Sequence, residues 1–422
     1  MTQEEFAQLQ YGMFVHFGLY SGLARGEWVM NRERIAPAEM KKIAEKFRPD
    51  QFNADELCRL AVDGGMRYLV FTTMHHDGFR MYDTSLSEFN AKKYCGRDLV
   101  REVIDSARRH GLKIGLYHSL NNWFDQPDAV NALENPAAYR TFIRNTFARL
   151  RELVTKFNPV DILWYDGWWP FDADGWQAER MNSEMRAVQP QLIFNGRNGL
   201  PGDFTTPEQH LTPPSPWRPW EACVTLNSHW GYHAGDTDWK RPVEIINMLL
   251  ACGANHGNLL LNIGPRGDGT IPEESIAIVR TVGQWLAAGG REAITACDPF
   301  KFSPTRPEKG DRGDWDPHGR MTVSGRNLFY ILEYWPGDPL TLAGFRGKVL
   351  AASADAGRIP LRFTQSGETL RIALPEILRT LTAPVIKLEC ETLPAIYRTG
   401  GMRTPECGHP RYDPIRPDIQ YE

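Results

Sequence analysis

The sequence predicts an α/β fold, a (β/α)8-like TIM barrel followed by a small C-terminal antiparallel β-sandwich. Short apolar segments alternate with amphipathic segments between residues 12 and 288, as expected for parallel strands joined by crossover helices. Polar residues follow the apolar segments directly, which favours a closed barrel over an open doubly wound sheet. Beyond residue 297, short β-rich segments separated by Gly, Pro and Asp turns replace this alternation, a pattern typical of an antiparallel sandwich.

The boundaries of these elements follow from hydrophobic periodicity and turn residues. Barrel strands are expected at residues 12–18, 67–74, 113–119, 161–166, 192–197, 220–225 and 258–265. Helices are expected at residues 37–47, 52–62, 99–110, 136–157, 176–188, 242–252 and 272–288. Sandwich strands are expected at residues 320–323, 328–332, 348–352, 361–364, 369–373 and 385–389. The sequence therefore predicts a catalytic barrel domain over residues 1–296 and a β-sandwich domain with a Pro-rich tail over residues 297–422.

Composition excludes several classes of function. The 422 residues include 48 basic and 52 acidic side chains, a formal net charge of −4, without a basic block, so neither nucleic acid nor a membrane is expected as a partner. No apolar run approaches membrane-spanning length. The seven cysteines are scattered and lack a CxxC pair, which argues against a disulfide framework and a zinc cluster.

The N-terminal residues show neither a positive n-region nor an apolar h-region. We therefore expect a cytoplasmic protein, although a secretion signal removed from this sequence would leave the same pattern. The sequence leaves the oligomeric state open.

The central candidate for catalysis is Asp166, which ends an apolar strand segment. Catalytic groups of parallel barrels lie at the C-terminal ends of strands. An Asp-Gly pair also suits a turn or a helix cap. Here, however, Trp164 precedes the acid and Trp168 and Trp169 follow it, and such flat apolar faces suit a sugar. We therefore interpret Asp166 as a catalytic carboxylate.

Glycoside hydrolysis needs a second carboxyl group that protonates the leaving oxygen. The candidates are Glu27, Glu208 and Glu221. Glu208 lies in an irregular segment that we expect to be a loop reaching over the barrel mouth, where substrate would partly desolvate it. Glu221 lies deeper, beside Trp220, and either has a structural role or orients a neighbour. Glu27 precedes Trp28 and suits a contact with sugar hydroxyls.

The pair His75-His76 follows the expected strand at residues 67–74. Two adjacent histidines at a strand end should point apart, and neither an HExxH helix nor a carboxylate triad accompanies them. We therefore expect no metal and no cofactor, and we assign these imidazoles to hydrogen bonds with hydroxyl groups. A GxSxG elbow and a glycine-rich phosphate loop are also lacking, which argues against a serine hydrolase and a dinucleotide enzyme.

Together these segments resemble the α-L-fucosidases of glycoside hydrolase family twenty-nine. The matching segments occur in family order at residues 12–21, 26–28, 75–79, 115–119, 164–167, 220–223, 230–232 and 257–265. Each segment alone is weak, but the ordered set is specific. The resemblance implies a retaining exo-glycosidase that releases terminal α-linked L-fucose from oligosaccharides or glycoconjugates by double displacement.

By motif match, the resemblance implies that Asp166 is the nucleophile. It places the acid/base at Glu208, with Glu221 as the alternative, and the segment around Glu208 is similar to the subgroup that prefers α-1,3/1,4-linked fucose. The substrate-binding residues that it implies are His16, Glu27, Trp28, His75, His76, Trp164 and Arg197. His118 is added as a candidate sugar contact, although a tyrosine is common at its position.

The expected partner is a fucosylated oligosaccharide. Two alternatives stay open at this point. One is a fucose-binding barrel that has lost turnover, and the other is a related barrel glycosidase acting on another hexose.

Overall fold

The structure is a computed structural model that describes residues 1–295 and 317–396. The chain divides into two compact units. The first comprises residues 1–241 and 256–280, and the second comprises residues 242–255 and the described residues from 281 onward. The predicted domain boundary at residues 296 and 297 and the predicted Pro-rich tail lie outside the described residues, and they stay predictions.

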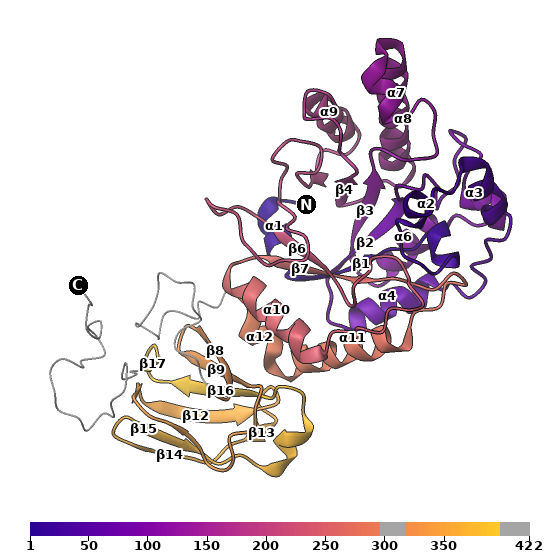
Figure 1. Cartoon of the computed structure of the whole chain (residues 1–422). Coiled ribbons are helices and arrows are strands. Elements are labelled where there is room, and N and C mark those ends of the chain that lie inside the picture. The colour runs from indigo at the N-terminus through magenta and orange to yellow at the C-terminus, as the bar shows by residue number, and fades with distance from the viewer. Residues whose placement is uncertain (296–316, 397–422) are drawn as a thin grey trace, which may run out of the picture. The chain divides into compact units, whose positions relative to one another are not determined.

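Within the described residues, the first unit is built on a seven-stranded parallel sheet with the order β5-β4-β3-β2-β1-β7-β6 (Figure 1). The strands are β1 (Tyr11–Val15), β2 (Tyr68–Met74), β3 (Lys113–Ser119), β4 (Ile162–Asp166), β5 (Ile193–Phe194), β6 (Glu221–Thr225) and β7 (Asn258–Ile263). Every residue of β1, β2, β4, β6 and β7 is buried. Strands buried on both faces are typical of parallel sheets covered by helices, which is why they appear in the sequence as nearly continuous apolar runs.

The segment that contains Glu208 connects the two edge strands of this sheet. Parallel bridges join Phe204 to Asn195, directly after β5, and Glu208 to Cys223 of β6. The segment therefore occupies an eighth strand position between β5 and β6, and the expectation of a loop over the barrel mouth is wrong. Pro207 gives the physical reason, because it lacks the N–H that a regular strand needs for its ladder. The sequence consequently shows no strand signal there.

The helices of the first unit follow the predicted alternation closely. Asn135 caps the longest of them, and its side chain accepts hydrogen bonds from the backbone N–H groups of Ala137 and Ala138. Such a cap satisfies donors that have no partner within the helix. The helices are α1 (Gln3–Ala7), η1 (Leu19–Gly22), α2 (Val29–Arg32), α3 (Pro37–Ala44), α4 (Ala54–Asp63), α5 (Ala91–Cys95), α6 (Leu99–Arg109), α7 (Ala129–Glu134), α8 (Pro136–Lys156), α9 (Ala178–Val188) and α11 (Glu273–Trp285), the last of which ends in the second unit. Across the described ranges, no helix combines the length and apolarity needed to cross a membrane.

The second unit contains helices and antiparallel sheets. Its helices are α10 (Pro242–Ala254), η2 (Leu286–Gly290), α12 (Arg291–Ile294) and η4 (Glu376–Thr380). In its described part, the larger sheet has the order β13-β12-β16-β9-β8, and the smaller sheets have the orders β10-β15-β14 and β11-β17. The strands are β8 (Gly319–Ser324), β9 (Asn327–Leu332), β10 (Leu340–Leu342), β11 (Phe345–Arg346), β12 (Val349–Ala354), β13 (Ile359–Pro360), β14 (Phe363–Ser366), β15 (Thr369–Ile372), β16 (Val385–Cys390) and β17 (Ala395–Ile396).

One hydrophobic core joins the sheets of the second unit. Leu328 and Tyr330 of β9 belong to the same buried cluster as Leu340 of β10 and Leu370 of β15. Two sheets that bury their inner faces against each other form a sandwich. The prediction of a parallel α/β barrel followed by antiparallel β-sheets is thus confirmed.

Candidate active site

Asp166 is the last residue of β4, and it is 8% exposed. Its Oδ2 accepts a hydrogen bond of 2.7 Å from the Tyr117 hydroxyl, and its Oδ1 accepts one of 3.1 Å from Arg197. The Nε2 atom of His76 lies 3.6 Å from Oδ2. Burial alone would raise the pKa of Asp166, but the charges of Arg197 and His76 and the Tyr117 hydrogen bond hold that pKa below its ordinary value. Asp166 is therefore an ionised, oriented carboxylate at neutral pH.

Arg197 joins Asp166 to Glu208. Its Nη1 donates to Asp166 at 3.1 Å, and its Nη2 donates to Glu208 at 2.8 Å. The guanidinium lies 4.7 Å from the centroid of the Trp164 ring. The Glu208 side chain is 42% exposed, whereas the side chain of Asp166, taken without its backbone, is 12% exposed. One guanidinium therefore holds a shielded carboxylate on one nitrogen and a solvent-facing carboxylate on the other.

Glu221 lies inside the barrel, at the N-terminal end of β6, and it is fully buried. Its Oε2 accepts a hydrogen bond of 2.5 Å from the Tyr68 hydroxyl, and its Oε1 accepts one of 3.0 Å from the Trp164 indole N–H. Burial raises the pKa of Glu221 to about 7. Both carboxyl oxygens of Glu221 are engaged, one of them by the indole against which Arg197 packs. This position therefore suits holding Trp164 better than protonating a leaving group.

His16 and His75 lie at the ends of β1 and β2. Nδ1 of His16 is 2.7 Å from Oδ1 of Asn262. The His75 ring stacks on Tyr117 at 5.4 Å, and its buried Nδ1 has no hydrogen-bond partner among the described residues. Burial lowers the pKa of both imidazoles, to about 3 for His16. Both rings are therefore neutral and able to donate or accept a hydrogen bond.

The rings of His75 and His76 lie side by side, with 4.2 Å between centroids. The expectation that they point apart is wrong, because β2 ends at Met74 and the alternation of strand side chains ends with it. Nδ1 of His76 is 2.6 Å from the Ser119 hydroxyl, which leaves Nε2 toward Asp166. In the described part of the chain, no group of three or more His, Cys, Asp and Glu side chains has a metal-binding arrangement.

Glu27 and Trp28 reach the same site from the segment after η1. The Glu27 carboxylate accepts a hydrogen bond of 2.8 Å from the backbone N–H of Gly231, and burial raises its pKa. The Trp28 ring contacts His76 at 5.4 Å, Trp123 at 5.0 Å and Trp169 at 6.2 Å. An aromatic wall thus surrounds the outer edge of His76.

His118 does not contribute to the site. It is fully buried on β3, its Nδ1 lies 2.9 Å from the Thr73 hydroxyl, and its Nε2 accepts a hydrogen bond of 3.4 Å from Arg149. The preceding residue, Tyr117, faces the barrel interior, and adjacent strand residues face opposite sides. The predicted sugar contact at His118 is therefore wrong, and Tyr117 is the β3 side chain that reaches Asp166.

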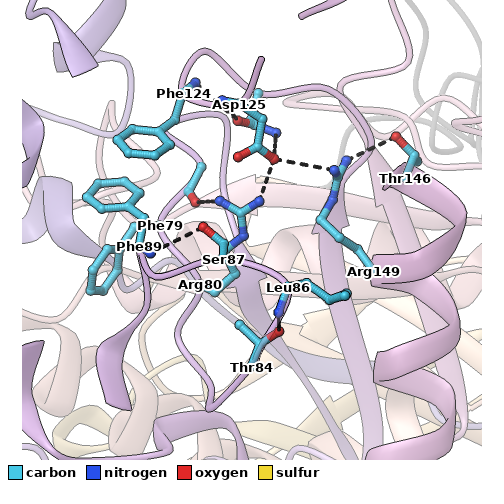
Figure 2. A network of polar contacts seen from close by, with 12 residues as sticks. Phe79, Arg80, Thr84, Leu86, Ser87, Phe89, Phe124, Asp125, Thr146 and Arg149 are labelled. Carbon is cyan, nitrogen blue, oxygen red and sulfur yellow. Dashed lines mark hydrogen bonds and ion pairs between the residues drawn. The ribbon is translucent and has the colours of Figure 1, made fainter. Parts of the chain in front are cut away.

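Behind His118, Arg149 belongs to a buried polar network (Figure 2). Arg149 and Arg80 both form ion pairs with Asp125, at 3.4 Å for Arg149. Two residues before this aspartate, the backbone N–H of Trp123 donates a hydrogen bond of 2.8 Å to the His76 carbonyl. The network therefore anchors the loop that presents Trp123 to the aromatic wall.

Sequence reasoning missed several residues at this site. Tyr117 directly precedes the predicted His118, and the register of β3 decides which of the two side chains faces the site. Asn262, a polar residue in an apolar strand, carried a usable signal. Trp123 and Ser119 carried none, because neither contact follows from a local pattern.

The structure brings together six of the predicted substrate-binding residues around the two carboxylates, together with Arg197, which bridges them. They are His16, Glu27, Trp28, His75, His76 and Trp164. Carboxylates at the C-terminal end of a barrel, enclosed by imidazoles and indoles, define a glycoside hydrolase site.

Comparison with known proteins identifies the family. Residues 1–291 match the model of the family described as alpha-L-fucosidase. The chain therefore belongs to the alpha-L-fucosidase family, as the ordered motifs indicated. Its activity is that of a glycoside hydrolase that releases terminal fucose.

Relatives and solved structures agree with this assignment. The tissue alpha-L-fucosidase of Rattus norvegicus is 31% identical over 365 residues, which cover 79% of this chain and 76% of that protein. Alpha-L-fucosidase isoenzyme 1 from Paenibacillus thiaminolyticus is 30% identical with a TM-score of 0.79, and the match covers 93% of this chain and all of that chain. The alpha-L-fucosidase GH29 from Bacteroides thetaiotaomicron, solved as a trapped covalent intermediate, is 22% identical with a TM-score of 0.75 and coverages of 92% and 96%.

Proposed function

We propose that the enzyme hydrolyses α-L-fucosides with retention, with Asp166 as the nucleophile and Glu208 as the acid/base. The observation that carries this proposal is the Arg197 bridge, which holds both carboxylates on one guanidinium. Retaining enzymes place these groups about 5–5.5 Å apart, whereas inverting enzymes leave a wider gap for water. The covalent intermediate trapped in the Bacteroides thetaiotaomicron enzyme supports the same course.

In the first step, Asp166 attacks the anomeric carbon of fucose, and the bond to the leaving oxygen breaks. Glu208 gives its proton to that oxygen. The Tyr117 hydroxyl and Arg197 hold the Asp166 carboxylate in an ionised, fixed orientation before attack. This preorganisation removes the cost of reorienting the nucleophile.

In the second step, Glu208 takes a proton from water, and the resulting hydroxide attacks the anomeric carbon and displaces Asp166. The exposure of Glu208, at 42%, admits that water. The neutral imidazoles of His16 and His75 form hydrogen bonds with the fucose hydroxyls. The buried Nδ1 of His75 supports this role, since it has no partner among the described side chains and backbone groups.

The geometry favours Glu208 over Glu221 as the acid, because Glu221 has both oxygens engaged inside the barrel. Linear free-energy measurements test this choice. The rate of Glu208→Ala should depend strongly on the pKa of the leaving group, and the rate of Glu221→Ala should not. The opposite pattern would exchange the two roles.

We further propose a preference for α-1,3/1,4-linked fucose, supported by the resemblance of the segments around Glu208 and at residues 220–227 to the subgroup with that preference. Initial rates with α-1,2-, α-1,3-, α-1,4- and α-1,6-fucosylated oligosaccharides test it. A higher kcat/KM for the α-1,2 or α-1,6 linkage would contradict the preference.

A panel of aryl glycosides tests turnover and sugar identity together. The proposal predicts activity on the α-L-fucoside above all other aryl glycosides. NMR of the first-formed product should show the α-anomer of fucose, and initial release of the β-anomer would contradict retention. Binding of fucose without hydrolysis of any fucoside would support a binding protein instead.

A further inference from the structure

Two exposed tryptophans directly follow the nucleophile. Trp168 is 37% exposed and Trp169 is 41% exposed, whereas Trp164 on the same segment is 1% exposed. Their rings meet edge to face with 5.4 Å between centroids. Large indoles usually bury most of their surface, so an exposed pair beside a catalytic carboxylate requires an explanation.

The backbone that presents these indoles is held in place. Gly167 adopts a φ of +65°, and a Cβ there would lie 2.5 Å from the Ser119 hydroxyl, so only glycine fits this turn. The Trp168 carbonyl accepts a hydrogen bond of 2.5 Å from the indole N–H of the fully buried Trp176. The exposure of the indoles is therefore built into a fixed turn.

Trp168 lies near the guanidinium that bridges the two carboxylates. The Arg197 guanidinium that binds Glu208 at 2.8 Å is 5.8 Å from the centroid of the Trp168 ring. Trp169 contacts His76 at 5.3 Å, and His76 is 3.6 Å from Asp166. The pair thus extends outward from the two carboxylates toward solvent.

We infer that Trp168 and Trp169 form the surface that binds the group attached to fucose, namely the pyranose ring next to it in a fucosylated oligosaccharide. This inference rests on the proposed function. Glu208 must reach the oxygen between fucose and that ring, so the ring begins at Glu208 and continues over the exposed indoles. The apolar face of a pyranose stacks on such rings, and their burial beneath it removes apolar surface from water.

The test compares two substrates that differ only beyond fucose. A fucosylated oligosaccharide carries the neighbouring ring, and α-L-fucosyl fluoride carries a single atom in its place. Trp168→Ala and Trp169→Ala should each lower kcat/KM for the oligosaccharide about three- to tenfold, mainly through KM. The value for the fluoride, which makes no stacking contact, should stay within about twofold for Trp168→Ala. For Trp169→Ala, whose indole also packs on His76, it should fall less than the value for the oligosaccharide.

The matched control is Trp217→Ala. Trp217 is also exposed, at 53%, and contacts His256, which precedes β7 at the N-terminal end of the barrel, opposite Asp166. This variant should leave both substrates unchanged. Equal losses with both substrates for the Trp168 and Trp169 variants, or no loss with the oligosaccharide, would overturn the inference.

A second measurement uses the unmodified enzyme and does not depend on whether the variants fold. Saturation-transfer NMR with the defucosylated oligosaccharide should show contact with the ring that had carried fucose, and an absent signal from that ring would overturn the inference. If the wild-type enzyme hydrolyses neither fucoside, the proposed function itself fails, which is a different result from a selective or non-selective loss in the variants.

Discussion

Two arginine–carboxylate clusters in the barrel unit have opposite compositions. In the active site, one arginine, Arg197, forms ion pairs with two carboxylates, Asp166 and Glu208. In the buried network of Figure 2, one carboxylate, Asp125, forms ion pairs with two arginines, Arg80 and Arg149. The three side chains of the first set carry a formal charge of −1, and those of the second set carry +1.

The two clusters differ in the surroundings of the charge that remains after pairing. Arg80 and Arg149 have side chains 3% and 4% exposed, and one further nitrogen of each donates to a backbone carbonyl, that of Gly78 for Arg80 and that of Leu120 for Arg149. These contacts hold together the segments that carry the three side chains. In the active site the second carboxylate, Glu208, faces solvent, and its side chain is 42% exposed. The same type of ion pair therefore stabilises the fold in the network around Asp125. In the active site it leaves a carboxylate available for proton transfer.

Removal of Asp166 should have the largest effect. Asp166→Gly should lower kcat for an aryl α-L-fucoside by at least roughly 10⁴-fold, since the proposed nucleophile is lost. Azide should restore part of the rate by entering the space left by the carboxylate. Spectrophotometric assays with and without azide measure both effects, and a variant that keeps more than about a hundredth of the wild-type rate would contradict the assignment.

Removal of the exposed carboxylate should have a smaller and more selective effect. Glu208→Ala should slow hydrolysis of substrates with poor leaving groups by roughly 10²–10⁴-fold, the range expected for loss of a general acid. An activated aryl fucoside should be affected far less in its first step. Rates across a series of aryl fucosides provide the measurement, and a loss independent of the leaving group would contradict an acid role for Glu208.

In the buried cluster, the same kind of change should affect stability rather than chemistry. Asp125→Asn leaves two buried guanidinium groups without their carboxylate and should lower the free energy of unfolding by about 3–5 kcal/mol. Urea denaturation measures this change. The matched control is Glu88→Gln, which breaks the exposed pair with Lys93 and should leave the unfolding free energy unchanged. An unchanged stability of Asp125→Asn would show that the network does not anchor its loops.

Glu221 differs from the carboxylates of both clusters, because it is buried and held by two uncharged hydrogen-bond donors. Burial raises its pKa to about 7, so between about pH 4.5 and pH 7 the folded state retains a proton that the unfolded state has lost. Wild-type stability should fall with rising pH across this window relative to Glu221→Gln, and the difference should level off above pH 7. Denaturation of both proteins from pH 4.5 to pH 8 tests this, and a pH-independent difference would contradict a buried, protonated Glu221.

Much of the barrel could be predicted because its strands are apolar runs and its helices have marked starts. Strand β3 lies at residues 113–119, as predicted, and Asp166 ends β4. The choice between Tyr117 and His118 failed, since one residue of register decides which side chain faces the barrel. The eighth strand position escaped detection because Pro207 interrupts its hydrogen-bond ladder.

The partners of Asp125 could not be predicted for a different reason. Arg80 and Arg149 lie 45 and 24 residues from it in the sequence, and no periodicity encodes which charged side chains meet. The same holds for Arg197, whose position after a short strand indicated the site but did not indicate a bridge between two acids. Contacts of this kind depend on tertiary packing, which hydrophobic patterns describe only as an inside and an outside.

We expect Asp166 to form the covalent bond to fucose while Glu208, across Arg197, acts as the acid/base. Incubation of Glu208→Gln with 2-fluoro-fucosyl fluoride should trap the intermediate, because the fluorine slows its breakdown and the variant lacks the base. Peptide mass spectrometry should then find the 2-fluoro-fucosyl group on Asp166. A label on another carboxylate would contradict the role of Asp166. Release of inverted fucose without any covalent adduct would contradict retention.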